Sequence, residues 1–162
     1  MNEAQKSRFE RAYAAYGAML YRIAVVSVCR KAEAEDCVSE TFLRYMRLGS
    51  AFGSADHEKA WLIRVCINIC KNFNKRAFNR KTTELPDAIA IGEDGYNRVE
   101  VRDMLSRLPR KTNLALYLKF YEGMTSAEIG KAMGLSAGGV RSLLSRAENV
   151  LRLELNDPEG DA

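Results

Sequence analysis

The sequence predicts an all-α protein made of two small helical domains joined by a linker. Apolar residues recur at intervals of three or four along most of the chain, which is the repeat of a helix face. The strip 82–96 has no such repeat, and it contains one proline, two glycines, four acids and no base. We therefore expect a helical domain at 1–81, an acidic linker at 82–96 and a second helical domain at 97–156.

Composition limits the class of protein. The chain has 162 residues, of which 47% are hydrophobic, enough to bury a core. It holds no apolar run near the roughly 18 residues of a membrane span, and its first residues lack the apolar stretch of a signal peptide, so we expect a cytoplasmic protein. The net charge is +4, but residues 1–81 carry 15 bases against 8 acids. Binding to a polyanion is therefore expected mainly in the first domain.

Two helical segments open the first domain. Aromatic and apolar residues at helical spacing predict one long helix over 8–29, or two short helices broken near Gly17. Helix formers with early acids and late bases predict a second helix over 31–47. Its apolar side should face a core through Val38, Phe42 and Tyr45, and its acidic side should carry Glu33, Asp36 and Glu40. A loop at 49–56 follows, with Ser54 or Asp56 as the N-cap of the next helix.

The segment 61–81 predicts a helix with two different faces. Leu62, Val65, Ile69 and Phe73 form an apolar stripe, and Asn68, Lys71, Asn72, Lys75 and Asn79 form a polar stripe at the same spacing. Its last eleven residues hold five bases, no acid and two phenylalanines, a mixture that suits phosphates and unstacked bases. An ordinary solvated surface helix is the other reading of the same stretch.

The sequence of the second domain predicts a helix-turn-helix. Apolar residues over 99–108 lead to Pro109, expected in the first turn of a helix that runs through Leu114, Leu116, Leu118 and Phe120. Over 126–144, Thr125 should cap one helix, Gly134 should form the turn, and Gly130 should allow two helices to cross. The second helix should pack inward through Val140, Leu144, Ala147 and Leu151, leaving a groove-facing side made of Ala137, Gly138, Arg141, Ser142 and Ser145. A helical hairpin that binds nothing has the same pattern.

Three blocks of the sequence resemble the bacterial RNA polymerase sigma factors of the small extracytoplasmic-function (ECF) group, a subfamily of the sigma-70 family. Residues 34–44, AEDCVSETFLR, are similar to the family's core-polymerase-binding helix. Residues 61–68, WLIRVCIN, are similar to the block that leads into the segment reading the −10 promoter element. Residues 105–109, 121–130 and 140–147 are similar to the domain that reads the −35 element. The resemblance covers about residues 9–155.

The resemblance implies promoter-specific transcription initiation, with core RNA polymerase and promoter DNA as partners and no catalytic residue, metal or cofactor. It places core polymerase binding at Glu35, Asp36, Val38, Glu40, Thr41 and Phe42. It places contacts with the −10 element at Trp61, Asn68, Lys71, Asn72, Lys75 and Arg76. It places contacts with the −35 element at Ser136, Gly138, Arg141, Ser142, Ser145 and Arg146. An anti-sigma factor is also implied as a partner.

Several positions depart from the family pattern. Asn72 and Lys75 stand where Asp and Arg are more usual, and Ser39 replaces a common Gln, which are tolerable polar changes. In the second domain Asn113, Gly139 and Leu143 replace the usual Arg, Thr and Arg. Two adjacent glycines near the start of the recognition helix cost about 1 kcal/mol each relative to alanine. These changes predict weak or unusual readout of the −35 element.

Three other classes of protein fit parts of the sequence. A free-standing helix-turn-helix regulator would bind DNA without polymerase, but it has no need for the blocks at 35–42 and 61–68. A nuclease could use Glu33, Asp36 and Glu40 to hold a metal, although an acidic helix face is usually solvated or docked. Zinc binding or thiol sensing would use some of the four cysteines, Cys29, Cys37, Cys66 and Cys70, for which buried structural roles are the expectation.

Overall fold

The computed structural model describes residues 2–28, 30–49, 52–79 and 108–155. Within these ranges every regular element is a helix, so the all-α prediction is confirmed. The chain divides into two compact units, Met1–Ile89 and Ala90–Ala162. In the described part of the chain, no helix is both long and apolar enough to cross a membrane. The helices are α1 (Glu3–Val28), α2 (Lys31–Leu48), α3 (Ala55–Asn79), α5 (Arg110–Phe120), α6 (Ser126–Met133) and α7 (Ala137–Leu155).

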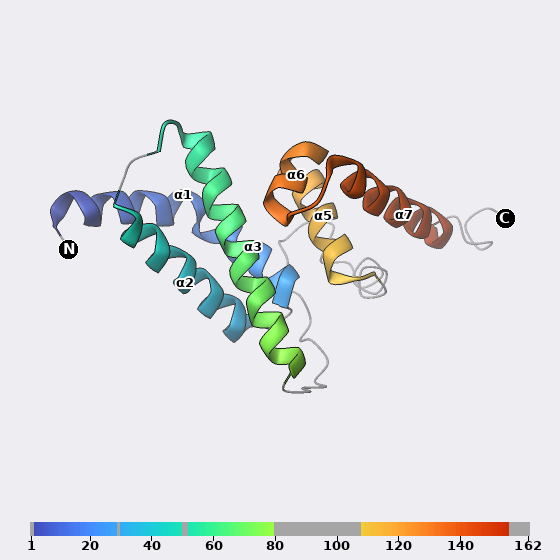
Figure 1. Ribbon diagram of the computed structural model, residues 1–162, viewed down its shortest axis with the longest axis horizontal. Helices are drawn as coiled ribbons and strands as arrows, with labels where there is room; N and C mark the ends of the chain where they lie inside the picture. The colour runs from blue at the N-terminus through green and yellow to red at the C-terminus, as the bar shows by residue number, and fades with distance from the viewer. Residues whose placement is uncertain (1, 29, 50–51, 80–107, 156–162) are drawn as a thin grey trace. The chain divides into compact units, whose positions relative to one another are not determined.

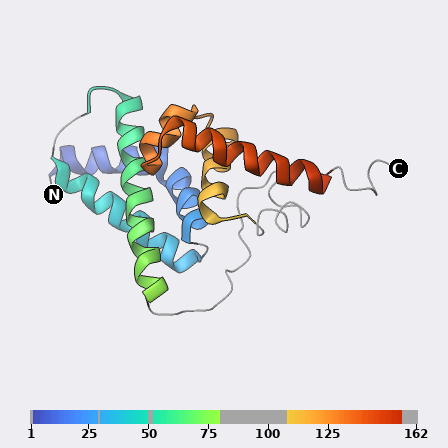
Figure 2. The same cartoon turned by 45° about the vertical axis from the view of Figure 1, so that its right-hand side comes forward.

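The first unit packs α1, α2 and α3 against one another in pairs, as both ribbon views show (Figures 1 and 2). Each helix turns one apolar face inward, as its periodicity predicts. Cys29 and the linker at 82–96 lie outside the described residues, as do residues 99–107, which hold most of the apolar residues expected before Pro109. The buried core of the first unit includes Leu20, Ile23, Ala24, Val38, Phe42, Tyr45, Leu62, Ile63, Cys66 and Ile67.

Helix α1 is continuous through Gly17, which excludes a break at that residue. One glycine costs a helix about 1 kcal/mol, and the packing of the following turn, where Leu20 and Ile23 are fully buried, offsets that cost. The aromatic half of the predicted stripe is less buried, since Tyr13 is 56% exposed. The Tyr13 ring nevertheless packs against Phe42 of α2, with 5.3 Å between ring centroids.

The start of α3 is fixed by Ser54 rather than by Asp56. The Ser54 hydroxyl accepts a hydrogen bond from the backbone N–H of His57 at 3.1 Å, and the Ser54 carbonyl accepts one from Glu58 N–H. Asp56 lies in the first turn of the helix, where its charge favours the positive end of the helix dipole. Of the two caps that the sequence left open, Ser54 is the one observed.

The second unit contains α5, α6 and α7, which contact one another in pairs (Figure 1). Thr125 caps α6 in a capping box with Glu128, and Gly134 ends it with a φ of 74°. Val140, Leu144 and Ala147 of α7 face inward, as predicted, whereas the side chain of Leu151 lies outside the described set. The predicted helix-turn-helix geometry over 126–144 is therefore confirmed.

One detail of the second unit corrects the sequence interpretation, and another adds to it. Pro109 precedes α5 as its N-cap residue, with an extended ψ of 148°, and does not lie in the first turn. Gly130 is also needed for the turn itself, because a Cβ there would lie 2.4 Å from the backbone carbonyl oxygen of Leu135. Leu114, Leu116 and Leu118 are buried as expected. Phe120, at the end of α5, is instead 61% exposed.

Candidate nucleic-acid and protein interfaces

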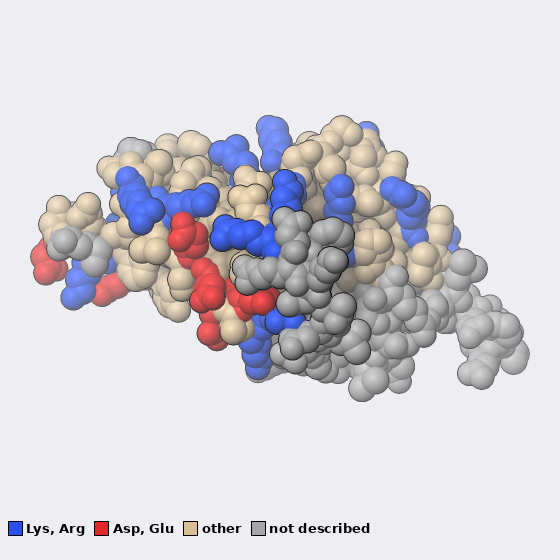
Figure 3. Space-filling model, turned by 60° about the horizontal axis from the view of Figure 1, so that its bottom comes forward, with Lys and Arg blue, Asp and Glu red and all other residues tan. Residues whose placement is uncertain are grey.

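The six residues predicted to bind core polymerase lie on two faces of α2, which we call the acidic layer and the buried layer. Glu35 and Asp36 are exposed, and Glu40 is partly exposed beside Arg44, with 3.4 Å between Oε1 and Nε. Figure 3 shows acidic side chains gathered on one face of the first unit, with basic side chains beside them. The other three residues, Val38, Thr41 and Phe42, are buried. Only the acidic layer is available to a partner, and the buried layer holds it in place.

The buried layer has specific contacts within the first unit. The Thr41 hydroxyl donates to the carbonyl of Cys37 at 2.7 Å, one turn earlier in the same helix. The Phe42 ring meets Phe9 of α1 edge to face, at 5.6 Å between centroids. The Phe42–Phe9 contact links the buried side of α2 to α1, and the acids lie on the other side of the helix.

The basic half of α3 presents the predicted polar stripe to solvent. Asn68, Lys71, Asn72 and Lys75 are all exposed, and Arg76 beside them is exposed too. On the opposite side Leu62 and Ile69 are buried and Phe73 is partly buried, which confirms the two-faced helix. The side chain of Asn79 lies outside the described set.

Asn74 anchors this basic half to α1, a role that the sequence pattern does not indicate. Its side-chain amide donates to the carbonyl of Ser27 at 2.9 Å, near the C-terminal end of α1. The carbonyls of a last helical turn have no partner in their own helix. The Asn74 contact therefore caps α1 and holds α3 beside it. A pattern of exposed amides could not single out Asn74, because its partner lies 47 residues away.

An aromatic cluster lies at the other end of α3. Trp61, the only tryptophan in the chain, is partly buried. Its ring centroid lies 5.6 Å from Phe52 in the preceding loop and 6.3 Å from Tyr45 of α2. Tyr45 and Phe52 are stacked at 6.1 Å with an interplanar angle of 11°, and His57 meets Phe52 edge to face. Only Trp61 of this cluster was among the predicted DNA-binding residues.

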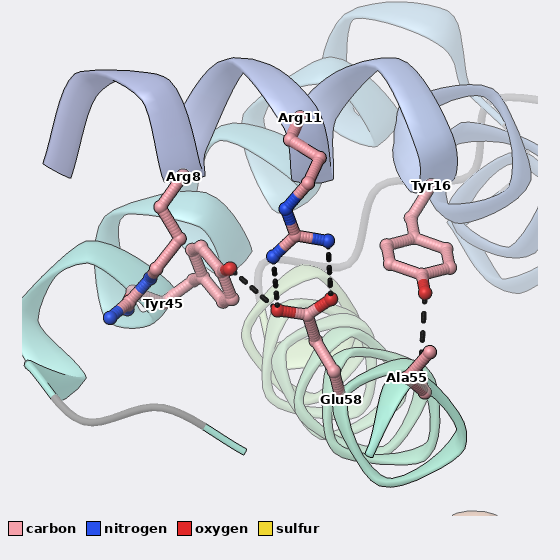
Figure 4. Close-up of polar contacts among 6 residues, drawn as sticks. All are labelled: Arg8, Arg11, Tyr16, Tyr45, Ala55 and Glu58. Carbon is pink, nitrogen blue, oxygen red and sulfur yellow. Dashed lines mark hydrogen bonds and ion pairs between the residues drawn. The ribbon is translucent and has the colours of Figure 1, made fainter. Parts of the chain in front are cut away.

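A buried carboxylate, Glu58, ties the start of α3 to both other helices (Figure 4). It is 5% exposed, and its two oxygens accept from the Arg11 guanidinium at 3.3 and 3.1 Å. The hydroxyl of Tyr45 donates to the same carboxylate at 2.7 Å. Arg8 lies over the Tyr45 ring, 4.6 Å from its centroid, and donates to the Tyr45 carbonyl at 2.9 Å. Tyr16 adds a 3.5 Å hydrogen bond to the carbonyl of Ala55.

The electrostatics of this network favour a charged Glu58. Burial is the largest influence and raises the pKa of the carboxyl, but the hydrogen bonds from Arg11 and Tyr45 and the nearby positive charges outweigh it, so the pKa is lowered. Burial and the bond to Glu58 raise the pKa of Tyr45. One sequence signal pointed to Glu58: it lies four residues before Leu62, on the apolar stripe of α3.

The six residues predicted to contact the −35 element are exposed on the second unit, five of them along the first turns of α7. Ser136 precedes α7, and its hydroxyl accepts from the N–H of Gly139 at 3.0 Å, which caps the helix. A Cβ at position 139 would come within 3.1 Å of that hydroxyl, a tight approach that glycine avoids. The exposed set is Ser136, Gly138, Arg141, Ser142, Ser145 and Arg146.

Three cysteines of the first unit that the structure describes are buried. Cys37, Cys66 and Cys70 are at most 2% exposed and are free thiols. Hydrogen bonding with Cys37 and Cys66, together with burial, raises the pKa of Cys70. The three buried thiols pack as small apolar side chains, which is the structural role expected for Cys37, Cys66 and Cys70. Within the described residues, no group of three or more His, Cys, Asp or Glu side chains could hold a metal ion, and this includes Glu33, Asp36 and Glu40.

Two family models match the chain, one in each unit. Sigma-70 region 2 matches residues 12–79, and Sigma-70, region 4 matches residues 98–150. Among curated proteins, the ECF RNA polymerase sigma factor BldN of Streptomyces coelicolor is 29% identical over 160 residues, which cover 92% of this chain and 61% of BldN. The ECF RNA polymerase sigma factor SigL of Mycobacterium tuberculosis is 28% identical over 154 residues, which cover 90% of this chain and 87% of SigL.

The fold is also found in a solved structure. It is the sigma factor RpoE of Bartonella quintana, crystallised with the anti-sigma factor NepR. The match has a TM-score of 0.70 and 21% sequence identity, and it covers 93% of this chain and 98% of the other. At this identity the likeness establishes the helical fold.

Proposed function

The chain belongs to the sigma-70 family of RNA polymerase sigma factors, in the ECF group, and on that premise we propose that it directs promoter-specific initiation. The first unit, with α1, α2 and α3, binds core RNA polymerase and the −10 element. The second unit, with the helix-turn-helix, binds the −35 element. The factor is a non-catalytic, cytoplasmic subunit of the holoenzyme. The 1–81, 82–96 and 97–156 division is the corresponding domain proposal.

The observation that carries this proposal is the exposed polar face of α3 inside the region 2 match. Asn68, Lys71, Asn72 and Lys75 lie in a row on a helix whose other side is buried in the core. Lysines neutralise phosphates, and amides offer both a donor and an acceptor to a base edge. Such a row suits a strand whose bases have left the stack, because unpaired bases expose their pairing edges.

In this proposal the factor consumes no nucleotide when the promoter opens. Unstacking and unpairing a base costs a few kcal/mol, which contacts with the captured strand must offset. Stacking of a base on an aromatic side chain contributes about 1–3 kcal/mol. Trp61, partly buried near the start of α3, presents such a ring. The α3 face and Trp61 together form the proposed −10 site.

The −35 site is the first half of α7. Arg141, Ser142 and Ser145 are exposed on the turns that a recognition helix places in the major groove. Arg146 donates to the carbonyl of Ser142 at 3.3 Å, which holds its guanidinium close to that face. Gly138 and Gly139 leave the start of the helix with no side chain to contact DNA. We therefore propose that readout of the −35 element rests on the arginines and serines.

The exposed acids of α2 form the proposed docking surface for core polymerase. Glu35, Asp36 and Glu40 share this surface, and the buried Phe42 fixes its orientation. A basic partner surface would complement them and would make docking sensitive to salt.

An anti-sigma factor is a further proposed partner. This proposal rests on the family and on the Bartonella quintana structure, in which the sigma factor RpoE is in complex with the anti-sigma factor NepR. Co-purification from the organism that encodes this chain would identify such a partner.

The free-standing regulator is disfavoured by the region 2 match over 12–79. A DNA-binding assay with and without core polymerase separates the two functions. Labelled promoter duplex is titrated with the chain alone, with sigma-free core alone, and with both. A sigma factor should give a heparin-resistant complex only when both are present. Tight, sequence-specific binding by the chain alone, unchanged when core is added, would support the regulator instead.

A further inference from the structure

The buried Glu58 network joins all three helices of the first unit at one point. Glu58 belongs to α3, Arg11 to α1 and Tyr45 to α2, and Figure 4 shows the Arg11 and Tyr45 side chains converging on the carboxylate. Arg11 lies 47 residues from Glu58 along the chain, so the contact exists only in the folded unit. Charge-assisted hydrogen bonds of this kind are strong and directional when one partner is shielded from water.

Tyr45 connects this network to the aromatic cluster. Its hydroxyl is held by Glu58 at 2.7 Å, while its ring stacks on Phe52 at 6.1 Å and contacts Trp61 at 6.3 Å. Arg8 covers the ring at 4.6 Å. A side chain fixed at both its hydroxyl and its ring has little freedom, and the two rings packed on it share that restriction.

We propose that Glu58 is a positioning residue, which acts through Tyr45 to hold Phe52 and Trp61 in the orientation required at the start of α3. This inference rests on the proposed function, in which α3 and Trp61 contact the −10 strand. Glu58 is buried and does not touch the DNA. Its removal would let Tyr45 turn, and the rings of Phe52 and Trp61 would then adopt several orientations. Strand capture would weaken because the site would have to be ordered again on binding.

The alternative is a network that contributes only to stability. In that case a change at Glu58 lowers the melting temperature but leaves Trp61 and the DNA contacts unaltered at temperatures where the protein is folded. The two roles can be separated because Trp61 is the only tryptophan in the chain. Its emission wavelength and its quenching by acrylamide report on the aromatic cluster directly.

The test uses Glu58→Gln, which keeps the shape of the side chain and removes its charge. Tyr45→Phe is the second variant, since it keeps the ring and removes only the hydroxyl that reaches Glu58. Glu10→Gln is the matched control, with the same chemical change at an exposed residue of α1. Trp61 fluorescence is measured on each free variant. Each variant is then assembled with core polymerase and titrated with a promoter fragment whose −10 region is unpaired by mismatches.

We expect Glu58→Gln and Tyr45→Phe to shift Trp61 emission to longer wavelength and to raise acrylamide quenching. We also expect them to weaken binding of the unpaired fragment by about fivefold or more, with core affinity unchanged and Glu10→Gln like wild type. Unaltered Trp61 emission and unaltered fragment binding in folded variants would overturn the inference. If Glu58→Gln does not fold, Tyr45→Phe decides the question by the same readouts. If the wild-type holoenzyme does not bind the fragment, the proposed function itself fails.

Discussion

Replacing Gly130 with alanine should damage the helix-turn-helix, although alanine is the better helix former. The added Cβ would lie 2.4 Å from the carbonyl oxygen of Leu135, whereas ordinary contacts begin at 3.4 Å. The turn must therefore move away by about 1 Å, the difference between these two distances. Leu135 N–H now donates to the Gly130 carbonyl at 2.8 Å, and Gly134 N–H bonds the same carbonyl, so the movement strains both bonds.

The expected cost follows from three contributions. Alanine gains about 1 kcal/mol in helix propensity over glycine. Overpacking costs about 1–3 kcal/mol, and a weakened backbone hydrogen bond costs about 1 kcal/mol. The net expectation is a loss of about 1–3 kcal/mol from the second unit. The turn leads directly into the Ser136 cap of α7, so binding of the −35 element should fall as well.

Urea denaturation measures this effect in each unit separately. Far-UV circular dichroism follows the helices of both units, and fluorescence of Trp61 follows the first unit alone. In Gly130→Ala, the part of the dichroism signal that comes from the second unit should be lost at a lower urea concentration than in wild type. The transition followed by Trp61 fluorescence should be unchanged. Gly138→Ala is the stability control, because its Cβ would meet only the Arg141 guanidinium, at 3.9 Å, and should not destabilise the unit. A Gly130→Ala protein as stable as wild type would refute the expected clash.

Three further predictions concern binding and pH. Arg141→Ala should weaken promoter binding by about 1–3 kcal/mol and relax preference within the −35 element if the guanidinium reads a base; equal affinity for wild type and variant in a filter-binding titration would exclude that role. Lys71→Ala should lower the slope of log affinity against log salt by about 1 through loss of a phosphate contact, whereas an unchanged slope would place Lys71 away from the backbone. The pKa of Glu58, ordinarily 4.5, is lowered in the folded state, so its contribution to stability is present above pH 4.5 and is lost as the pH falls through the lowered value. The loss of stability on acidification should therefore be smaller in Glu58→Gln than in wild type, and identical acid unfolding curves for the two proteins would contradict this prediction.

Local features of the fold could be predicted because their causes are local. The two faces of α3 follow from spacing, and the Thr125 cap and the Gly134 turn follow from residues within a few positions of each other. The continuity of α1 through Gly17 could not be decided in this way, because propensity opposes it and tertiary packing favours it.

The parts that could not be predicted depend on contacts between distant segments. The partners of Glu58 lie 47 and 13 residues away, and nothing in the spacing of Arg11 or Tyr45 indicates that they converge. Gly130 is a different case, since its close neighbour is the nearby backbone carbonyl of Leu135, and which backbone atoms a turn brings together depends on the conformation of the turn and not on residue spacing. The family resemblance indicated the candidate site residues, and the structure shows which of them are exposed.

The central claim is that this chain gives core polymerase its promoter specificity. The most direct measurement adds the purified chain to sigma-free core polymerase and genomic DNA of the organism that encodes it, and sequences the 5′ ends of the transcripts. We expect discrete start sites that share two upstream motifs. The motif nearer the start site, at −10, should lose its influence on transcription when Asn68 is replaced. The motif at −35 should lose its influence when Arg141 is replaced. No stimulation over core alone, with the same core active beside another sigma factor, would contradict the claim.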